Sequence, residues 1–166
     1  MSKAKIIKRL NWLYSAEKFF AIVFTGITII VLIKLPKPET IFLLYGLLII
    51  TIILFQGQHY WKLKFYALTE KPFDQKKNFE LFKKAKRLNL IIISIIPLII
   101  LVQQFLTDWR IYFYGQYSLT YFCILEHINY YHRQLMIDSI SDLDYLLKNK
   151  RLKIASLKKY IDNKEI

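Results

Sequence analysis

The sequence predicts an all-α fold: a polytopic integral membrane protein with four transmembrane helices as two tandem helical hairpins, plus a short cytoplasmic C-terminal helix. Four apolar runs without charged residues, basic residues gathered between alternate runs, and a motif that occurs twice lead to this prediction. The 166 residues suffice for one domain, yet they are 55% hydrophobic and carry a formal net charge of +13. A soluble domain of this size rarely hides so much apolar surface, whereas a membrane protein combines apolar spans with basic ends.

The uncharged runs are four in number: residues 19–33, 40–61, 88–107 and 111–125. A helix needs about 20 residues to cross ~30 Å of hydrocarbon, so the second and third runs are long enough alone. The first is lengthened if Lys18 and Lys34 extend their charged ends toward the interface. The fourth has to continue through Glu126 to about Tyr131. The predicted spans of this bundle, which occupies residues 1–136, are therefore about 17–35, 40–61, 88–107 and 111–131.

The basic residues predict the orientation of the spans. Twenty-two of them lie before span one, between spans two and three, or after span four, and three lie in the other two loops. Because basic residues are retained on the cytoplasmic side, we expect both termini in the cytoplasm and two very short outer loops. We expect a multi-pass protein of the bacterial plasma membrane whose basic face meets anionic lipid headgroups. Nucleic acid is not an expected partner, because the basic residues alternate with apolar runs.

The tetrapeptide KRLN occurs at residues 8–11 and again at 86–89, each time leading into an outward-running span. The returning spans end in LFQGQHYW and ILEHINYY, and an ungapped alignment of these octapeptides pairs two polar positions of each. This pattern predicts two copies of one hairpin in parallel orientation, related by an axis along the membrane normal. Chance identity between apolar segments is the alternative.

A polar cluster is expected where spans two and four approach the cytoplasm. Both spans run inward, so their polar ends reach the same depth, and we expect Glu126 to contact segment 56–59. Unpaired polar groups in apolar surroundings cost about 1–3 kcal/mol, so these groups need partners. The candidate ligand-binding residues are Gln56, His59, Glu126, His127, Asn129, His132 and Arg133.

Packing between spans accounts for this cluster more simply than a binding site does. The aromatic residues at positions 60, 61, 130 and 131 stand where an interfacial aromatic belt is typical, and Glu126 is able to hydrogen-bond Gln56 between spans. A ligand, proton or cofactor site is the alternative, because intramembrane ionisable groups are often functional.

A metal or haem site has weak support, and no cofactor is assigned. Side chains at positions 127 and 132 point about 140° apart on a regular helix, so both histidines cannot bind one ion. A metal held by His59, Glu126 and His127, or a haem between histidines of two helices, remains open. A polar stripe on span four comprises Gln116, Thr120, Cys123, His127 and Gln134.

Local signals predict where helices begin and bend. Asp74 or Asn78 is expected to cap a helix that continues into span three, and Pro97 should kink that span. Residues 137–166 are expected to form a cytoplasmic amphipathic helical tail, with Ser141 and Asp144 as its capping box. The apolar stripe of this tail is a candidate partner-binding surface: Leu143, Leu147, Ile154, Leu157 and Ile161.

The tiny outer loops, the basic inner face and the lack of a catalytic motif favour a non-catalytic component that assembles, supports or regulates a membrane complex. Its partner would be another membrane protein or a second copy of the chain. An oligomeric transporter or pore, with the stripe of span four lining the path, is the second hypothesis. A metal- or haem-dependent membrane enzyme is the third.

Overall fold

The computed structural model describes residues 3–35, 38–106, 113–137 and 139–163, with all side chains except those of residues 39 and 113–116. These residues form helices and no β-strand, as the all-α prediction requires. The elements are α1 (Lys3–Lys34), the 3-10 turn η1 (Pro38–Thr40), α2 (Ile41–Leu68), α3 (Gln75–Ser94), α4 (Ile96–Leu106), α5 (Phe113–Tyr131), α6 (Ile140–Asn149) and α7 (Ser156–Asn163).

Three helices are long and apolar enough to cross a membrane: α1, α2 and the run Gln75–Leu106 that comprises α3 and α4. This finding indicates a membrane protein. The 19 residues of α5 also have a suitable length. Glu126, His127 and Asn129 interrupt the apolar sequence in the second half of α5.

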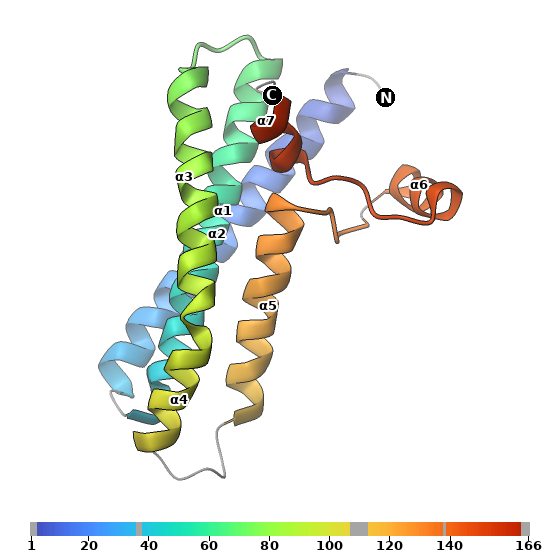
Figure 1. Cartoon of the computed structure of the whole chain (residues 1–166). Helices are drawn as coiled ribbons and strands as arrows, with labels where there is room; N and C mark the ends of the chain where they lie inside the picture. The colour runs from blue at the N-terminus through green and yellow to red at the C-terminus, as the bar shows by residue number, and fades with distance from the viewer. Residues whose placement is uncertain (1–2, 36–37, 107–112, 138, 164–166) are drawn as a thin grey trace.

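Successive passes of the chain run in opposite directions along an elongated bundle (Figure 1). α1 leads away from the end that carries both chain termini, α2 returns to it, α3 and α4 lead away again, and α5 returns. We call this end of the bundle the terminal end. Both short C-terminal helices lie there, α7 against the bundle and α6 projecting to one side.

α2 is the central helix of the bundle. It packs most extensively against α1 and α5, and also against α3 and α4. Its side chains Ile49, Ile50 and Ile53 are fully buried at the centre of the core. α5 packs more against α2 than against α3, so the contacts of the bundle centre on α2.

α1 is apolar on its outer faces as well as toward α2. Phe19, Ile30 and Ile33 are each at least 60% exposed. A helix that is hydrophobic all round is typical of a membrane span, because lipid covers the faces that protein does not. The bare outer surface of α1 is therefore the surface expected of a lipid-facing helix.

The helix before the third apolar run begins and bends as predicted. The Asp74 carboxylate caps α3 by accepting a hydrogen bond from the Lys77 backbone N–H at 2.8 Å. The run breaks at Ile95, two residues before Pro97, which separates α3 from α4. The Ser94 hydroxyl donates to the Ile91 carbonyl at 2.7 Å.

The C-terminal tail differs from its prediction as one continuous helix. α6 ends at Asn149, its C-cap Lys150 has a φ of 47° in the left-handed region, and α7 begins only at Ser156. Between them the chain runs back beside the end of α5, where the Gln134 N–H donates to the Lys153 carbonyl at 2.9 Å. The predicted apolar stripe is thus divided between two helices that face different surroundings.

The start of α6 was also predicted two residues too late. Ser139, not Ser141, is the N-cap, and its hydroxyl accepts from the Asp142 N–H at 3.3 Å and donates to the Asp142 carboxylate at 2.6 Å. Lys153 forms an ion pair with the same carboxylate at 2.6 Å. Asp142 is 8% exposed, so this group joins α6 to the returning segment.

α7 returns the chain to the bundle. Leu157 and Tyr160 are almost fully buried, and the Tyr160 hydroxyl donates to the Gln75 carbonyl at the start of α3 at 3.1 Å. Burial and the nearby Asp74 carboxylate raise the pKa of Tyr160 above its ordinary value. The docked tyrosine therefore stays protonated and keeps its hydrogen bond at neutral pH.

Candidate functional site

Polar side chains of α2, α3 and α5 meet inside the bundle in its half nearest the terminal end. Gln56 of α2 donates to Asn89 Oδ1 of α3 at 3.0 Å, and Asn89 donates back to Gln56 Oε1 at 2.7 Å. The Tyr131 hydroxyl of α5 donates to the same Gln56 oxygen at 2.7 Å. Asn89 and Tyr131 are fully buried. We call Gln56, Asn89 and Tyr131 the amide network; it ties three helices together.

Among the described residues, Glu126 makes no hydrogen bond to segment 56–59, where its contact was predicted. Its carboxylate accepts a hydrogen bond from Asn129 Nδ2 at 3.4 Å, on its own helix. Asn89 instead pairs with Gln56, because one amide side chain is able both to donate a hydrogen bond to another amide and to accept one from it. A carboxylate is only able to accept when ionised.

His59 lies on the α3 side of α2, not beside α5. Its Nε2 lies 2.6 Å from Asn78 Oδ1, and its ring packs near the Phe82 ring with centroids 5.6 Å apart. Asn78 is therefore the partner of His59 and not the helix cap that was considered for it, a role that Asp74 fills. The two histidine-bearing ends of α2 and α5 face different neighbours.

The His127 and His132 rings lie close together at the end of α5. α5 ends at Tyr131, and the Arg133 N–H bonds to the Ile128 carbonyl five residues back, so His132 folds over the helix end. The two imidazole centroids are 5.4 Å apart, whereas the sequence predicted that these rings would diverge. The divergence was wrong because the regular helix stops between them.

His127 is 3% exposed, and its ring stacks on Tyr131 with centroids 5.1 Å apart. Neither ring nitrogen of His127 has a hydrogen-bond partner among the described residues. Burial and the ammonium groups of Lys86 and Lys158 lower the pKa of His132 below its ordinary value. This second imidazole is therefore neutral at pH 7.

The last two candidate ligand-binding residues serve the helix end. Asn129 Oδ1 accepts from the backbone N–H of Leu135 at 2.9 Å, which holds the chain as it leaves α5. The Arg133 side chain is exposed and donates to the Leu152 carbonyl at 3.4 Å. The predicted cluster is therefore several separate groupings, and it does not converge on one site.

The polar stripe of α5 packs against α2. Thr120 and Cys123 are buried, and the Cys123 thiol donates to the Gly46 carbonyl at 3.2 Å. A side chain at Gly46 would come within 3.1 Å of Leu119, so this glycine allows the close approach. The side chain of Gln116 lies outside the described residues.

The predicted aromatic belt is largely internal. Tyr60, Tyr130 and Tyr131 are at most 5% exposed and point into the bundle, and only Trp61 is half-buried. Each of the three tyrosines uses its hydroxyl for a contact between segments that are distant in the chain. The Tyr60 hydroxyl, for example, donates to Ser156 Oγ of α7 at 2.9 Å.

Sequence reasoning missed Glu17. Its carboxylate accepts a hydrogen bond from the Tyr130 hydroxyl, which joins α1 to α5, and its other oxygen, Oε2, is buried without a partner among the described residues. A signal was present, because Glu17 is the single acidic residue among the first 38. A lone carboxyl group at the start of an apolar run needs a partner within the protein.

Within the described ranges, no group of three or more His, Cys, Asp or Glu side chains is placed to hold a metal ion. The trio of His59, Glu126 and His127 considered from the sequence therefore does not form such a group. Comparison with known protein families, curated proteins and solved structures gave no match.

Proposed function

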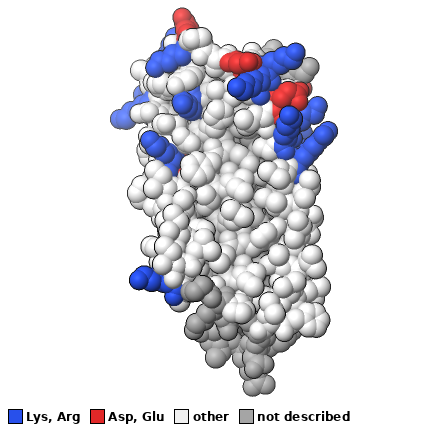
Figure 2. All heavy atoms as spheres, turned by 90° about the vertical axis from the view of Figure 1, so that its left-hand side faces the viewer, with Lys and Arg blue, Asp and Glu red and all other residues white. Residues whose placement is uncertain are grey.

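We propose that the chain crosses a membrane four times as a four-helix bundle of two tandem hairpins, with both termini in the cytoplasm. Three helices have the required length and hydropathy, and α5 runs beside them in the direction opposite to α4 (Figure 1). On the face drawn in Figure 2, most Lys and Arg side chains gather around the terminal end. Basic residues remain on the cytoplasmic side during insertion, which supports this orientation.

Reporter fusions test the topology. Fusions after Lys37 and after Trp109, two positions outside the described residues, should place the reporter outside the cytoplasm. Fusions after Gln75 and at the C-terminus should place it inside, because the basic segments resist translocation. Alkaline phosphatase and a fluorescent protein report the two sides with opposite signals. Fluorescence from either outer loop would overturn the four-span topology.

The chain's function, in this proposal, is that of a non-catalytic assembly, scaffold or regulatory component of a complex in the bacterial plasma membrane. The observation that supports it is the projecting helix α6 (Figure 1). Ile140, Leu143 and Leu147 lie on one face of α6 and are 81%, 45% and 69% exposed. We call these three residues the α6 face. An apolar face of this kind on a projecting helix is typical of a contact surface.

The α6 face replaces the partner surface expected from the sequence. Leu157 is 1% exposed and Ile161 packs against the core of the bundle, so both are used inside the chain. Ile154 is 40% exposed and lies in the returning segment, outside α6. Leu143 and Leu147 are the two residues of the expected stripe that lie exposed on α6.

Replacing Ile140, Leu143 and Leu147 with Ser should release the chain from its complex. Each apolar side chain contributes about 1.5–3 kcal/mol when a partner covers it fully, so the triple variant should lose most of the affinity. The measurement is the particle mass after mild solubilisation of native membranes. Wild type should run well above the 20.0 kDa of the single chain, and the variant should shift toward it.

The matched control is Asp144→Ser with Lys148→Ser. Both residues are exposed on α6, and the pair leaves the net charge unchanged. This variant should keep the particle mass of wild type. A wild-type chain that runs alone, or a triple variant that keeps its complex, would contradict the role of α6 as a contact helix.

The two other hypotheses have less support. Thr120, Cys123 and His127 are buried inside the bundle. The stripe of α5 is therefore unsuited to line an aqueous path through a single chain. A pore would then need a path between copies of the chain. Among the described residues of the stripe, only Gln134 is even half-buried rather than fully buried, so the stripe offers no polar surface for such a path. A metal-dependent enzyme would need ligands beyond the histidines described above. A haem between helices has little support, because His59 contacts Asn78 of α3 whereas His127 stacks on Tyr131 of its own helix.

A further inference from the structure

A cavity of about 280 Å³ lies at the terminal end of the bundle, between α1, α2, the end of α5 and the start of α7. Small-molecule pockets usually measure about 300–1,000 Å³, so this cavity suits a compact group such as a headgroup. Its lining includes the cationic side chains of Arg9 and Lys64 and the apolar side chains of Leu10, Leu13 and Leu157. A charged end and an apolar wall suit an amphiphilic ligand.

The Lys64 ammonium is the unusual feature of the lining. It donates to Ser156 Oγ at 2.7 Å and lies 5.6 Å from the Tyr60 ring centroid. No carboxylate lies within ion-pair distance of this ammonium among the described residues, although its side chain is half-buried. A partly buried cation without a counter-ion is costly, so the site favours an anion.

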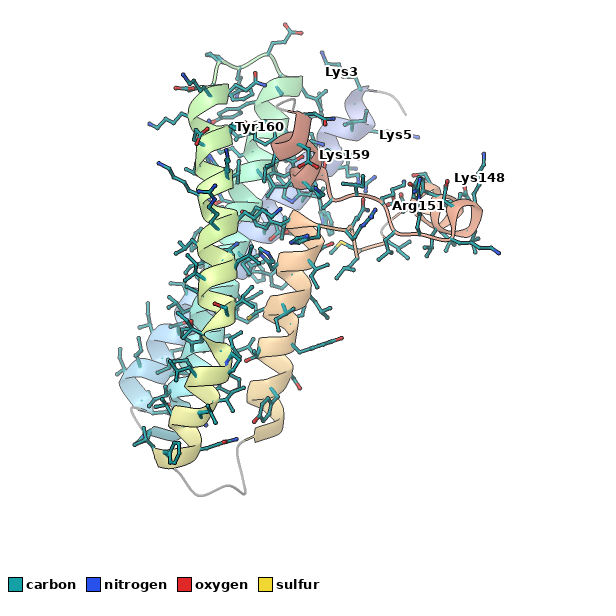
Figure 3. The ribbon with its side chains drawn as sticks, viewed as in Figure 1. Lys3, Lys5, Lys148, Arg151, Lys159 and Tyr160 are labelled. Atoms are coloured by element: carbon teal, nitrogen blue, oxygen red, sulfur yellow. The ribbon has the colours of Figure 1, made fainter. Side chains whose placement is uncertain are left out.

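Two other cations reinforce this preference. Lys159 of α7 and Arg9 of α1 both lie close enough to Lys64 to repel its positive charge. Figure 3 shows Lys159 at the terminal end, where Lys3 and Lys5 also lie, while Lys148 lies on the projecting α6 and Arg151 follows its end. Of these cations, Lys64 and Arg9 line the cavity, and Arg9 also pairs with the Asp142 carboxylate at 3.9 Å. A phosphate group at Lys64 would be attracted by all three positive charges, those of Arg9, Lys64 and Lys159.

Two buried polar atoms of the lining also lack a hydrogen-bond partner among the described residues. They are Trp61 Nε1, which donates, and Glu17 Oε2, which accepts from a hydroxyl group. A headgroup that carries a hydroxyl as well as a phosphate supplies an acceptor for Trp61 Nε1 and a donor for Glu17 Oε2. The carboxylate of Glu17 also makes a bare, multiply charged anion a poorer fit than a phosphodiester.

We propose that this cavity binds the headgroup of an anionic phospholipid, with the phosphodiester at Lys64 and Arg9 and a headgroup hydroxyl toward Glu17. The apolar wall of Leu10, Leu13 and Leu157 favours a lipid over a soluble phosphate ester, because it shelters the first part of the acyl chains. The cavity lies at the end of the spans, at the depth where lipid headgroups are found. This site is independent of the α6 face.

Lipid exchange on the purified protein tests the site. The chain in a neutral detergent is incubated with phosphatidylglycerol, the anionic probe, or with phosphatidylcholine, and the bound lipid is counted by native mass spectrometry. Wild type should retain one phosphatidylglycerol with at least tenfold preference over phosphatidylcholine. Lys64→Gln should lower phosphatidylglycerol binding at least tenfold, and Lys64→Arg should keep most of it.

Lys62→Gln is the matched control. Lys62 lies on the same helix with its ammonium 5.5 Å from the Tyr66 ring centroid, outside the cavity lining, and its replacement removes the same charge. It should bind phosphatidylglycerol within twofold of wild type. Met136→Trp provides a second variant, because Met136 lines the cavity yet is 50% exposed. The larger ring should fold normally, as circular dichroism would report, and obstruct lipid binding.

Four outcomes would overturn the proposal. Equal binding of the two lipids, or equal losses in Lys64→Gln and Lys62→Gln, would mean that general surface charge attracts lipid. Full binding by a correctly folded Met136→Trp would place the lipid elsewhere. Displacement of phosphatidylglycerol by millimolar glycerol phosphate would assign the phosphate site to a soluble ester and reject the lipid as its ligand.

Discussion

Gly57→Ala should destabilise the bundle by about 1–3 kcal/mol, the usual cost of forcing extra atoms into a packed interior. A methyl group at Gly57 would overlap the ring and hydroxyl of Tyr130, which is 5% exposed. The tyrosine is unable to retreat cheaply, because its hydroxyl is bound to Glu17 on a third helix. Thermal unfolding in detergent, followed by circular dichroism, measures the loss.

Gly26→Ala is the matched control for this prediction. Gly26 has open space where the methyl group would lie, so this change should be neutral or stabilise α1 by about 0.5–1 kcal/mol. In a Tyr130→Leu background, Gly57→Ala should lose most of its effect, since the overlapping ring is gone. An equal cost in both backgrounds would show that Tyr130 is not the obstacle.

Asn89→Leu should cost about 1–3 kcal/mol, because it leaves the Gln56 amide N–H group unpaired inside the bundle. Asn89 is fully buried, and both of its side-chain hydrogen bonds in the amide network go to Gln56. Unfolding by a denaturing detergent reports the change in stability. Removing the other polar groups of the amide network should recover the lost stability without restoring the asparagine.

The triple variant Gln56→Leu, Asn89→Leu, Tyr131→Phe provides that reversal. It removes all the polar groups of the amide network together, and matched apolar replacement of hydrogen-bonded partners is often nearly neutral. Gln58→Leu, on the same helix outside the network, should change stability by less than about 0.5 kcal/mol. If the triple variant were less stable than Asn89→Leu, the unpaired amide would not be the cause of the loss.

The helical character and the apolar runs were readable from the sequence because hydropathy and charge are local properties. α1, α2 and the α3–α4 helix each contain a predicted run, and Asp74 and Pro97 marked a helix start and a break correctly. Helix extent was less accurate. α2 continues seven residues past its predicted run, to Leu68, because polar residues after the run extend the helix.

The pairing of side chains was decided by the tertiary structure. The sequence identified Gln56 and Glu126 as polar groups at similar depth, but partners depend on the rotation of each helix about its axis. That rotation places Asn89 beside Gln56 and Glu17 beside Tyr130. Neither pairing follows from periodicity, since each joins residues on different helices.

Residues near helix ends show the same division. The sequence indicated an apolar, amphipathic tail, yet only the folded chain places Lys150 in a left-handed conformation, which divides the tail and buries Leu157 while α6 stays exposed. The early end of α5 likewise brings His127 and His132 together. Composition determined which segments become apolar helices. The tertiary structure decided where each helix ends and which residues its faces contact, because these contacts arise only once the segments are packed.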